Sequence, residues 1–132
     1  MKQYDAIVIG FGKGGKTLAG EMADHGWQVA MVEKSDKMYG GTCINIGCIP
    51  TKALIEQAAQ GQIKGVRSRE EQLRAYRQAV EKKDQLTGAL REANFKMLDD
   101  RENVTVYNGE ASFLSPTAVR VRLANGETLD DI

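Results

Sequence analysis

The stretch that most constrains the fold is GFGKGG at residues 10–15, which fits the pattern G-x-G-x-x-G with glycines at 10, 12 and 15. It follows YDAIVIG, a short apolar run typical of a buried parallel strand. Apolar residues then recur at helical spacing over residues 13–25, and Gly26 suits the end of that helix. The next segment, WQVAMVE, reads as a second strand ending at Glu33. The pattern predicts a βαβ unit with a right-handed crossover.

A glycine turn between a strand and a helix predicts a dinucleotide-binding site. Gly10 would permit the tight turn, Gly12 would let the backbone approach a pyrophosphate, and Gly15 would let the helix pack closely on the strand. The helix N-terminus offers N–H groups to the phosphates. Glu33, 18 residues after Gly15, would accept a hydrogen bond from a ribose hydroxyl and repel a 2′-phosphate, which disfavours NADP at this site. An ordinary glycine-rich turn is the alternative.

Two lysines accompany the turn. Lys13 stands where small residues are more usual, and Lys16 lies one helical turn along. Either they add attraction for phosphate groups or they are simply solvated. The sequence GKT at 15–17 lies too close to Gly10 for a Walker-type loop, which disfavours a nucleoside triphosphatase.

Two helical segments are predicted in the middle of the chain. TKALIEQAAQ at 51–60 favours a helix, and GQIKGVRS at 61–68 is expected to interrupt it with two glycines. From Arg69 to about Asp99 a second, long helix is predicted. We expect its apolar stripe to pack on the sheet; the stripe comprises Leu73, Tyr76, Val80, Leu86, Leu90 and Met97 or Leu98.

The last third of the chain changes period. Residues 103–113 and 117–132 alternate apolar and polar side chains, as antiparallel strands do. ANG at 124–126 predicts a hairpin turn, and Pro116 is expected in the connecting loop. The fold class predicted is therefore α/β: a Rossmann-like half with a parallel sheet, a long helix, and a C-terminal antiparallel β-meander.

Charge and hydropathy narrow the functional classes. The chain has 18 basic and 18 acidic side chains, and this balance disfavours a non-specific nucleic-acid binder. No apolar run approaches the roughly 20 residues needed to cross a bilayer. The four apolar residues at 6–9 are too few for the core of a signal peptide. We expect a cytoplasmic protein with no membrane or nucleic-acid partner, and in that reducing compartment a cysteine pair favours catalysis, redox sensing or metal binding.

The chain's two cysteines lie in GGTCINIGCIPTK, residues 40–52. Two thiols and the lone His25 cannot complete a tetrahedral zinc site within one chain, so no metal site is predicted. A disulfide between Cys43 and Cys48 would close a loop of six residues and would remove only about 2 kcal/mol of loop entropy from the unfolded state. A structural crosslink would therefore contribute little.

The spacing of the cysteines instead favours redox cycling. In a regular helix, the rise between Cys43 and Cys48 would be about 7.5 Å, beyond the limit of about 7 Å for a disulfide. The segment must therefore distort, and Gly47 lets it bend. A strained, accessible pair is labile. Pro50 suits a first helical turn, which places Cys48 near a helix N-terminus, where the dipole stabilises a thiolate.

GGTCINIGCIPTK after a Rossmann half-unit resembles the flavoprotein disulfide reductases, a family that includes dihydrolipoamide dehydrogenase, glutathione reductase and mercuric reductase. With GFGKGGKTLAGEMADHGWQVAMVEKS, the chain looks most similar to the branch of reactive-chlorine-resistance flavoproteins, which carry the same lysine-bearing turn. The resemblance is strong over residues 4–52 and looser over the later strands.

This resemblance implies FAD as the cofactor. Cys48 would be the thiol nearest the flavin, forming the charge-transfer thiolate, and Cys43 would be the interchange thiol that meets the acceptor. The resemblance further implies that electrons pass from NAD(P)H to FAD, to this pair, and then to a disulfide, a lipoamide or a metal ion such as Hg(II) or Cu(II). The cofactor-binding residues it implies are Gly10, Gly12, Gly15, Glu33, Gly41, Thr42, Lys52 and, through its backbone near the adenine, Ala111.

Members of this family are much longer and carry an NAD(P)H domain and a dimerisation domain. We therefore expect residues 1–132 to be the amino-terminal part of an incomplete FAD-binding domain, inactive alone, within a homodimeric full-length enzyme. The alternative is a non-catalytic FAD- or nucleotide-binding module whose cysteine pair senses oxidants. A small thiol–disulfide protein without flavin is a third possibility, but the C-x-x-C pattern typical of that class is absent.

Overall fold

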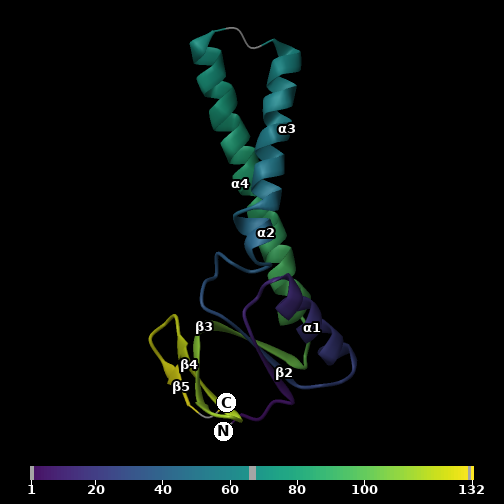
Figure 1. The fold of residues 1–132 in the computed structure, drawn as a ribbon, viewed down its shortest axis with the longest axis vertical. Helices are drawn as coiled ribbons and strands as arrows, with labels where there is room; N and C mark the ends of the chain where they lie inside the picture. The colour runs from purple at the N-terminus through teal and green to yellow at the C-terminus, as the bar shows by residue number, and fades with distance from the viewer. Residues whose placement is uncertain (1, 66–67, 131) are drawn as a thin grey trace.

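A computed structural model describes residues 2–65, 68–130 and 132. The predicted α/β class is confirmed (Figure 1). The elements in chain order are β1 (Ala6–Ile9), α1 (Lys13–Asp24), β2 (Val29–Glu33), α2 (Thr42–Asn45), α3 (Cys48–Lys64), α4 (Arg69–Asp99), β3 (Val104–Ser115), β4 (Ala118–Leu123) and β5 (Thr128–Leu129).

The five strands of the described residues form one sheet in the order β1-β2-β3-β4-β5. β1 and β2 pair in parallel, as the βαβ prediction requires, and β2 pairs in parallel with the first half of β3. The second half of β3 pairs antiparallel with β4, and β4 with β5, which confirms the β-meander. The turn at 124–126 is confirmed, with Gly126 at φ +91° and its N–H donating to Leu123 O at 3.0 Å.

β3 changes partners at Gly109. A Cβ at this position would lie 2.5 Å from the carbonyl oxygen of Arg122 on β4, so the two backbones approach too closely for any side chain. β3 thereby joins the parallel and antiparallel parts of the sheet in one continuous strand, which was not predicted from the sequence.

β2 is the centre of the core. Val29 and Met31 face one layer, with Phe11, Ala19 and Leu98, whereas Ala30 and Val32 face the other. Each large apolar side chain buried in this way contributes roughly 1.5–3 kcal/mol. The second layer is completed by Tyr107 of β3, Val119 and Val121 of β4, and Ile132.

β1 differs from the buried strand that was expected. It lies at the edge of the sheet, its first three residues are only half-buried, and the exposed fraction of Ile9 is 49%. The strand itself is present, but an edge strand has one neighbour rather than two. Its apolar run therefore remains partly open to solvent.

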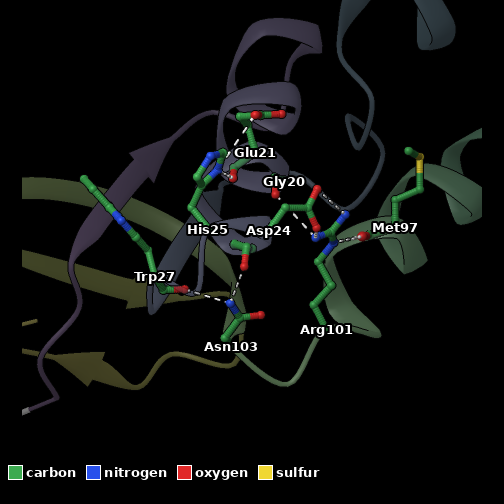
Figure 2. A network of polar contacts seen from close by, with 9 residues as sticks. Gly20, Glu21, Asp24, His25, Trp27, Met97, Arg101 and Asn103 are labelled. Atoms are coloured by element: carbon green, nitrogen blue, oxygen red, sulfur yellow. Dashed lines mark hydrogen bonds and ion pairs between the residues drawn. The ribbon is translucent and has the colours of Figure 1, made fainter.

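The ends of α1 and α4 are fastened to each other by polar contacts (Figure 2). Arg101, just after α4, pairs with Asp24 at the end of α1 and donates from Nη1 to Gly20 O at 3.3 Å. Asn103 donates from Nδ2 to Ala23 O at 2.7 Å and to Trp27 O at 2.9 Å. These contacts hold the βαβ unit against the start of β3. We call the sheet, α1 and residues 94–103 the base.

The expectation that α4 packs on the sheet along its stripe is wrong for most of the helix. Only its C-terminal end reaches the base, where Leu98 is 1% exposed. The rest of α4 packs against α3, and the two helices together project from the base (Figure 1). We call residues 54–64 and 69–86 the outer hairpin. Large apolar side chains are exposed there, including four from the two helices: Ile55, Ile63, Leu73 and Tyr76.

The expected interruption at 61–68 begins later than predicted. α3 continues through Gly61 to Lys64, and Gly65 ends it in the left-handed conformation at φ +68°. Gly61 costs a helix about 1 kcal/mol relative to alanine. It lines a groove of about 470 Å³ with Ala58, Ala75 and Tyr76 between the two helices. Residues 66–67 of the interruption lie outside the described residues.

α4 begins at a capping box, in which Glu71 N–H donates to Ser68 Oγ at 3.1 Å and Ser68 N–H donates to Glu71 Oε2 at 2.9 Å. Pro116 lies in the β3–β4 connection, as predicted. Of the helices in the described parts of the chain, none combines the length and apolar character needed to cross a membrane.

Candidate functional site

The glycine turn has the geometry predicted for Gly10 and Gly15. Gly10 has φ +105°, and its N–H donates to Val32 O at 2.8 Å. A Cβ on Gly15 would lie 2.2 Å from Gly10 O and 3.2 Å from Val8 Cγ1. Only glycine at both positions lets α1 start this close to β1.

Gly12 is the N-cap of α1. Unlike Gly15, it has open space where a Cβ would lie, and unlike Gly10 it has a φ of −75°, which other residues can adopt. No side chain caps this end of the helix, and its first turn contains no acidic residue. The first amide groups of a helix lack intrahelical partners and attract anions. The turn therefore fits the pyrophosphate of a dinucleotide such as FAD.

Glu33 ends β2 beside this turn. Its Oε2 accepts the Phe11 N–H at 2.9 Å, and its Oε1 accepts the Ser35 N–H at 3.1 Å. These bonds fix the carboxylate while each oxygen keeps a second lone pair. A ribose hydroxyl can be accepted there, as the sequence predicts.

An open hollow of about 410 Å³ lies where the chain leaves β2, lined in part by Lys34, Ser35, Gly109 and Arg122. This is the carboxyl end of a parallel pair, where α/β sheets bind nucleotides. Ala111 is half-buried on β3, opposite Val121, and does not line the hollow. The predicted contact between Ala111 and an adenine therefore stays a prediction.

The cysteine-bearing segment lies directly on the glycine turn. The Gly40 N–H donates to Phe11 O at 3.0 Å. A Cβ on Gly41, which has φ +83°, would lie 2.8 Å from Gly12 Cα. The starts of α1 and α2 are therefore adjacent, which brings Thr42, the first residue of α2, beside the turn.

The two cysteines occupy the starts of consecutive helices. Cys43 is the second residue of α2 and Cys48 the first of α3, with Gly47 between the helices. The predicted distortion of this segment is therefore confirmed, and so is the placement of Cys48 at a helix N-terminus. Pro50 is buried in the first turn of α3. Both cysteines are free and exposed.

The thiols interact with each other. Their hydrogen bond is the main reason that the pKa of Cys43 is raised above its ordinary value, whereas the positive charges of Lys13 and Lys52 act in the opposite direction. The two lysines approach from different helices, α1 and α3. The charge of Lys13 therefore acts on the Cys43 thiol, which was not predicted from the sequence.

Lys16 is not left solvated. Its Nζ donates to Asn94 Oδ1 on α4, and Asn94 is only 6% exposed. Of the two lysines considered for phosphate attraction, Lys13 alone has an exposed position at the start of α1.

The residues behind the cysteine segment were not predicted from the sequence. The Tyr39 ring lies 5.1 Å from that of Phe11 and 4.8 Å from that of Phe95 between ring centroids. Asn45 and Arg91 add a polar contact between α2 and α4. Two features of the sequence could have indicated this contact. They are the asparagine in CINIG and the polar residues that lie between the apolar residues of the α4 stripe. In residues 2–65, 68–130 and 132, no three histidine, cysteine or acidic side chains gather as metal ligands would.

Comparison with known proteins agrees with this arrangement. The family model described as pyridine nucleotide-disulphide oxidoreductase matches residues 4–131. The probable pyridine nucleotide-disulfide oxidoreductase RclA of Escherichia coli is 43% identical over 126 residues, which cover 96% of this chain and 26% of RclA. Mercuric reductase of Streptomyces lividans is 32% identical, over 95% of this chain and 27% of its own length.

The fold has a solved counterpart. The Cu(II) complex of the HOCl-induced flavoprotein disulfide reductase RclA from E. coli superposes with a TM-score of 0.83 at 42% identity, covering 98% of this chain and 26% of that chain. The chain thus spans about a quarter of the length of RclA and of this mercuric reductase. The predicted resemblance to reactive-chlorine-resistance and mercuric-reductase-like proteins is confirmed.

Proposed function

Because the chain belongs to the pyridine nucleotide-disulphide oxidoreductase family, we propose that it forms the FAD-binding and redox-disulfide part of an NAD(P)H-dependent flavoprotein disulfide reductase. The observation that carries the proposal is the contact between Gly41 and Gly12. It joins the cysteine pair to an open, uncapped helix N-terminus of the kind that binds pyrophosphate. A nucleotide cofactor and a dithiol can therefore share one site.

Different residues of the chain are assigned to different parts of the cofactor. Gly10, Gly12 and Gly15 shape the phosphate turn, and Glu33 orients the ribose. Bound FAD supplies two-electron exchange between a nicotinamide nucleotide and a disulfide. Gly41, Thr42 and Lys52 line the cofactor side of the cysteine segment.

The two thiols have unequal positions. Cys48 is the first residue of α3, and we assign it to the cofactor side. Cys43 is the exchange thiol. Its thiolate attacks an acceptor disulfide, which releases one acceptor thiol and leaves a mixed disulfide. The Cys48 thiolate then attacks the Cys43 sulfur, which forms the Cys43–Cys48 disulfide and releases the second acceptor thiol. Two electrons leave the pair in each such cycle. The positive charges of Lys13 and Lys52 partly offset the rise that Cys48 causes in the Cys43 pKa.

The acceptor class follows from the same exposed pair. A low-molecular-weight disulfide or a lipoamide fits the exchange chemistry. RclA of E. coli has been solved as a Cu(II) complex, which supports a metal ion as an acceptor. We further propose that the full-length enzyme is a homodimer, and that the 132-residue chain by itself does not oxidise NADPH. NADPH turnover by the purified chain would contradict that last proposal.

FAD binding is tested by reconstituting the chain, removing unbound FAD and measuring flavin absorbance. We expect the wild type to retain FAD and Gly12→Ala to bind it at least about tenfold more weakly, a loss of about 1.4 kcal/mol. The added methyl group meets no protein atom but would occupy the phosphate position. Gly14→Ala is the matched control, since its Cβ also meets nothing. Equal binding by Gly12→Ala would overturn the assignment.

A second experiment separates the reductase part from an oxidant-sensing module, which the exposure of both thiols also fits. The cysteine pair is first oxidised to the disulfide, and the bound FAD is then reduced under anaerobic conditions. The free thiols of the protein are counted before and after the reduction. Two new thiols per FAD support the reductase. No new thiols would favour the sensor.

A further inference from the structure

We infer that Arg91 is a positioning residue for the Cys43–Cys48 pair and acts through Asn45. The inference rests on the proposed redox function of that pair. Arg91 lies on α4, 46 residues from Asn45, and touches neither the glycine turn nor the thiols in any described contact. Its role follows from what Asn45 holds.

Asn45 is the last residue of α2, between the two cysteines. Its Nδ2 donates to Tyr39 O at 2.9 Å and to Gly41 O at 2.8 Å. Both amide hydrogens are thus used to fasten the end of α2 to the loop that precedes it. Cys43 lies inside the closed loop that these bonds form.

The remaining polar atom of Asn45 faces α4. Its Oδ1 accepts the Arg91 Nε–H at 2.8 Å. Within the described chain, no carboxylate lies in ion-pair distance of Arg91, so the amide oxygen takes the place that a carboxylate would usually fill. The planar guanidinium donates Nε–H in a fixed direction, which lysine cannot reproduce. Arg91 therefore sets the orientation of the Asn45 amide.

Neighbouring residues of α4 hold the same loop. A Cβ on Gly40 would lie 3.1 Å from Asn94 Cγ, and the Phe95 ring packs 4.8 Å from that of Tyr39. Cys43 is therefore positioned from α4, whereas Cys48 belongs to α3. The separation of the two thiols depends on how firmly α2 is held against α4.

Loss of the Arg91 contact should loosen α2 and lower the effective concentration of one thiol at the other. A lower effective concentration makes the intramolecular disulfide less favourable relative to a disulfide with an external thiol. The protein dithiol and glutathione disulfide are in equilibrium with the protein disulfide and two molecules of glutathione. The equilibrium constant for closing the Cys43–Cys48 disulfide can therefore be measured directly.

The test equilibrates the purified chain in glutathione buffers and counts free thiols by alkylation and mass spectrometry. For Arg91→Met we expect the constant for disulfide closure to fall about tenfold, equal to a rise of about 30 mV in potential. Arg77→Met is the matched control, because Arg77 is an exposed arginine of the same helix, about 21 Å along its axis from Arg91. It should leave the constant unchanged.

A double-mutant cycle separates action through Asn45 from general damage. If Arg91 acts through Asn45, Arg91→Met should have no further effect in an Asn45→Ala background. Arg91→Lys should resemble Arg91→Met, since it keeps the charge and loses the directed Nε–H. Circular dichroism of each variant reports whether the fold is intact.

An unchanged constant in folded Arg91→Met, additive effects in the cycle, or a wild-type constant in Arg91→Lys would each overturn the inference and leave the proposed function standing. If Arg91→Met does not fold, folded Asn45→Ala must show the tenfold fall, and its failure to do so overturns the inference. A wild-type chain that never forms the intramolecular disulfide would overturn both proposals.

Discussion

The base and the outer hairpin bury their apolar residues very differently. In β2 of the base, four consecutive residues are at most 1% exposed, whereas in the hairpin Ile63 is 86% and Leu73 50% exposed. A central strand is covered on both faces, but two helices that pack only on each other bury one seam and leave their outer sides open. No residue of the described outer hairpin is fully buried. Local unfolding should therefore require less free energy in the hairpin than in the base.

The largest effect on stability is expected at Gly15, where the base leaves no room for a side chain. Gly15→Ala would place a methyl group 2.2 Å from a backbone oxygen, and we expect the free energy of unfolding to fall by about 3 kcal/mol or more. Urea unfolding followed by circular dichroism measures it. Gly14→Ala, whose methyl group is unobstructed, should change stability by less than about 1 kcal/mol. Similar values for both variants would contradict the tight packing of the base.

One helix crosses both regions and allows a direct comparison. Leu98→Ala, at a 1% exposed position in the base, should cost about 3 kcal/mol because it leaves a cavity. Leu73→Ala, on the same helix in the outer hairpin, is half-exposed and should cost less than about 1 kcal/mol. Thermal or urea unfolding of the two variants checks the ratio. A cost for Leu73→Ala as large as that for Leu98→Ala would show that the hairpin is covered in solution.

A smaller effect is expected within the hairpin itself. Gly61→Ala adds a methyl group that meets no atom within 4 Å, and alanine favours a helix by up to about 1 kcal/mol. Amide hydrogen exchange in α3 should slow about fivefold, while exchange in β2 stays unchanged. Equal slowing in both elements would instead indicate that the two regions unfold together.

The smallest effect concerns pH. The hydrogen bond from Arg101 lowers the pKa of Asp24 below its ordinary value of 3.8. The resulting stabilisation of the base is present above that ordinary value and is lost as pH falls through the lower folded-state pKa. In Arg101→Met, an NMR titration should return the Asp24 pKa toward 3.8. The Asp130 carboxylate, whose pKa is lowered by Arg120, is the internal control, and an unaltered Asp24 titration would disprove the link.

The sequence predicted the local parts of the site well. The spacing of Gly10, Gly15 and Glu33 defines a turn whose geometry depends on residues close in the chain, and the structure reproduces it. Gly47 and Pro50 likewise indicated a break and a new helix between the cysteines. In each case the residue type restricts the backbone directly.

The contacts between distant segments could not be predicted in the same way. An apolar stripe indicates that a helix packs against another element, but it does not identify that element. The stripe of α4 did not reveal that most of the helix packs against α3 rather than the sheet. The pairing of β3 with both β2 and β4 depends on a close approach at Gly109. The single bond between Asn45 and Arg91 leaves no periodic pattern in the sequence.

The contact between Gly41 and Gly12 has a practical consequence for protein engineering. A side chain at position 41 would enter the space of the Gly12 backbone, so the cysteine segment and the nucleotide turn are complementary parts. A transplant of GGTCINIGCIPTK into another Rossmann scaffold should succeed only where the recipient turn also offers a bare backbone at the position of Gly12. Libraries that diversify one of the two segments should keep the glycines of the other fixed.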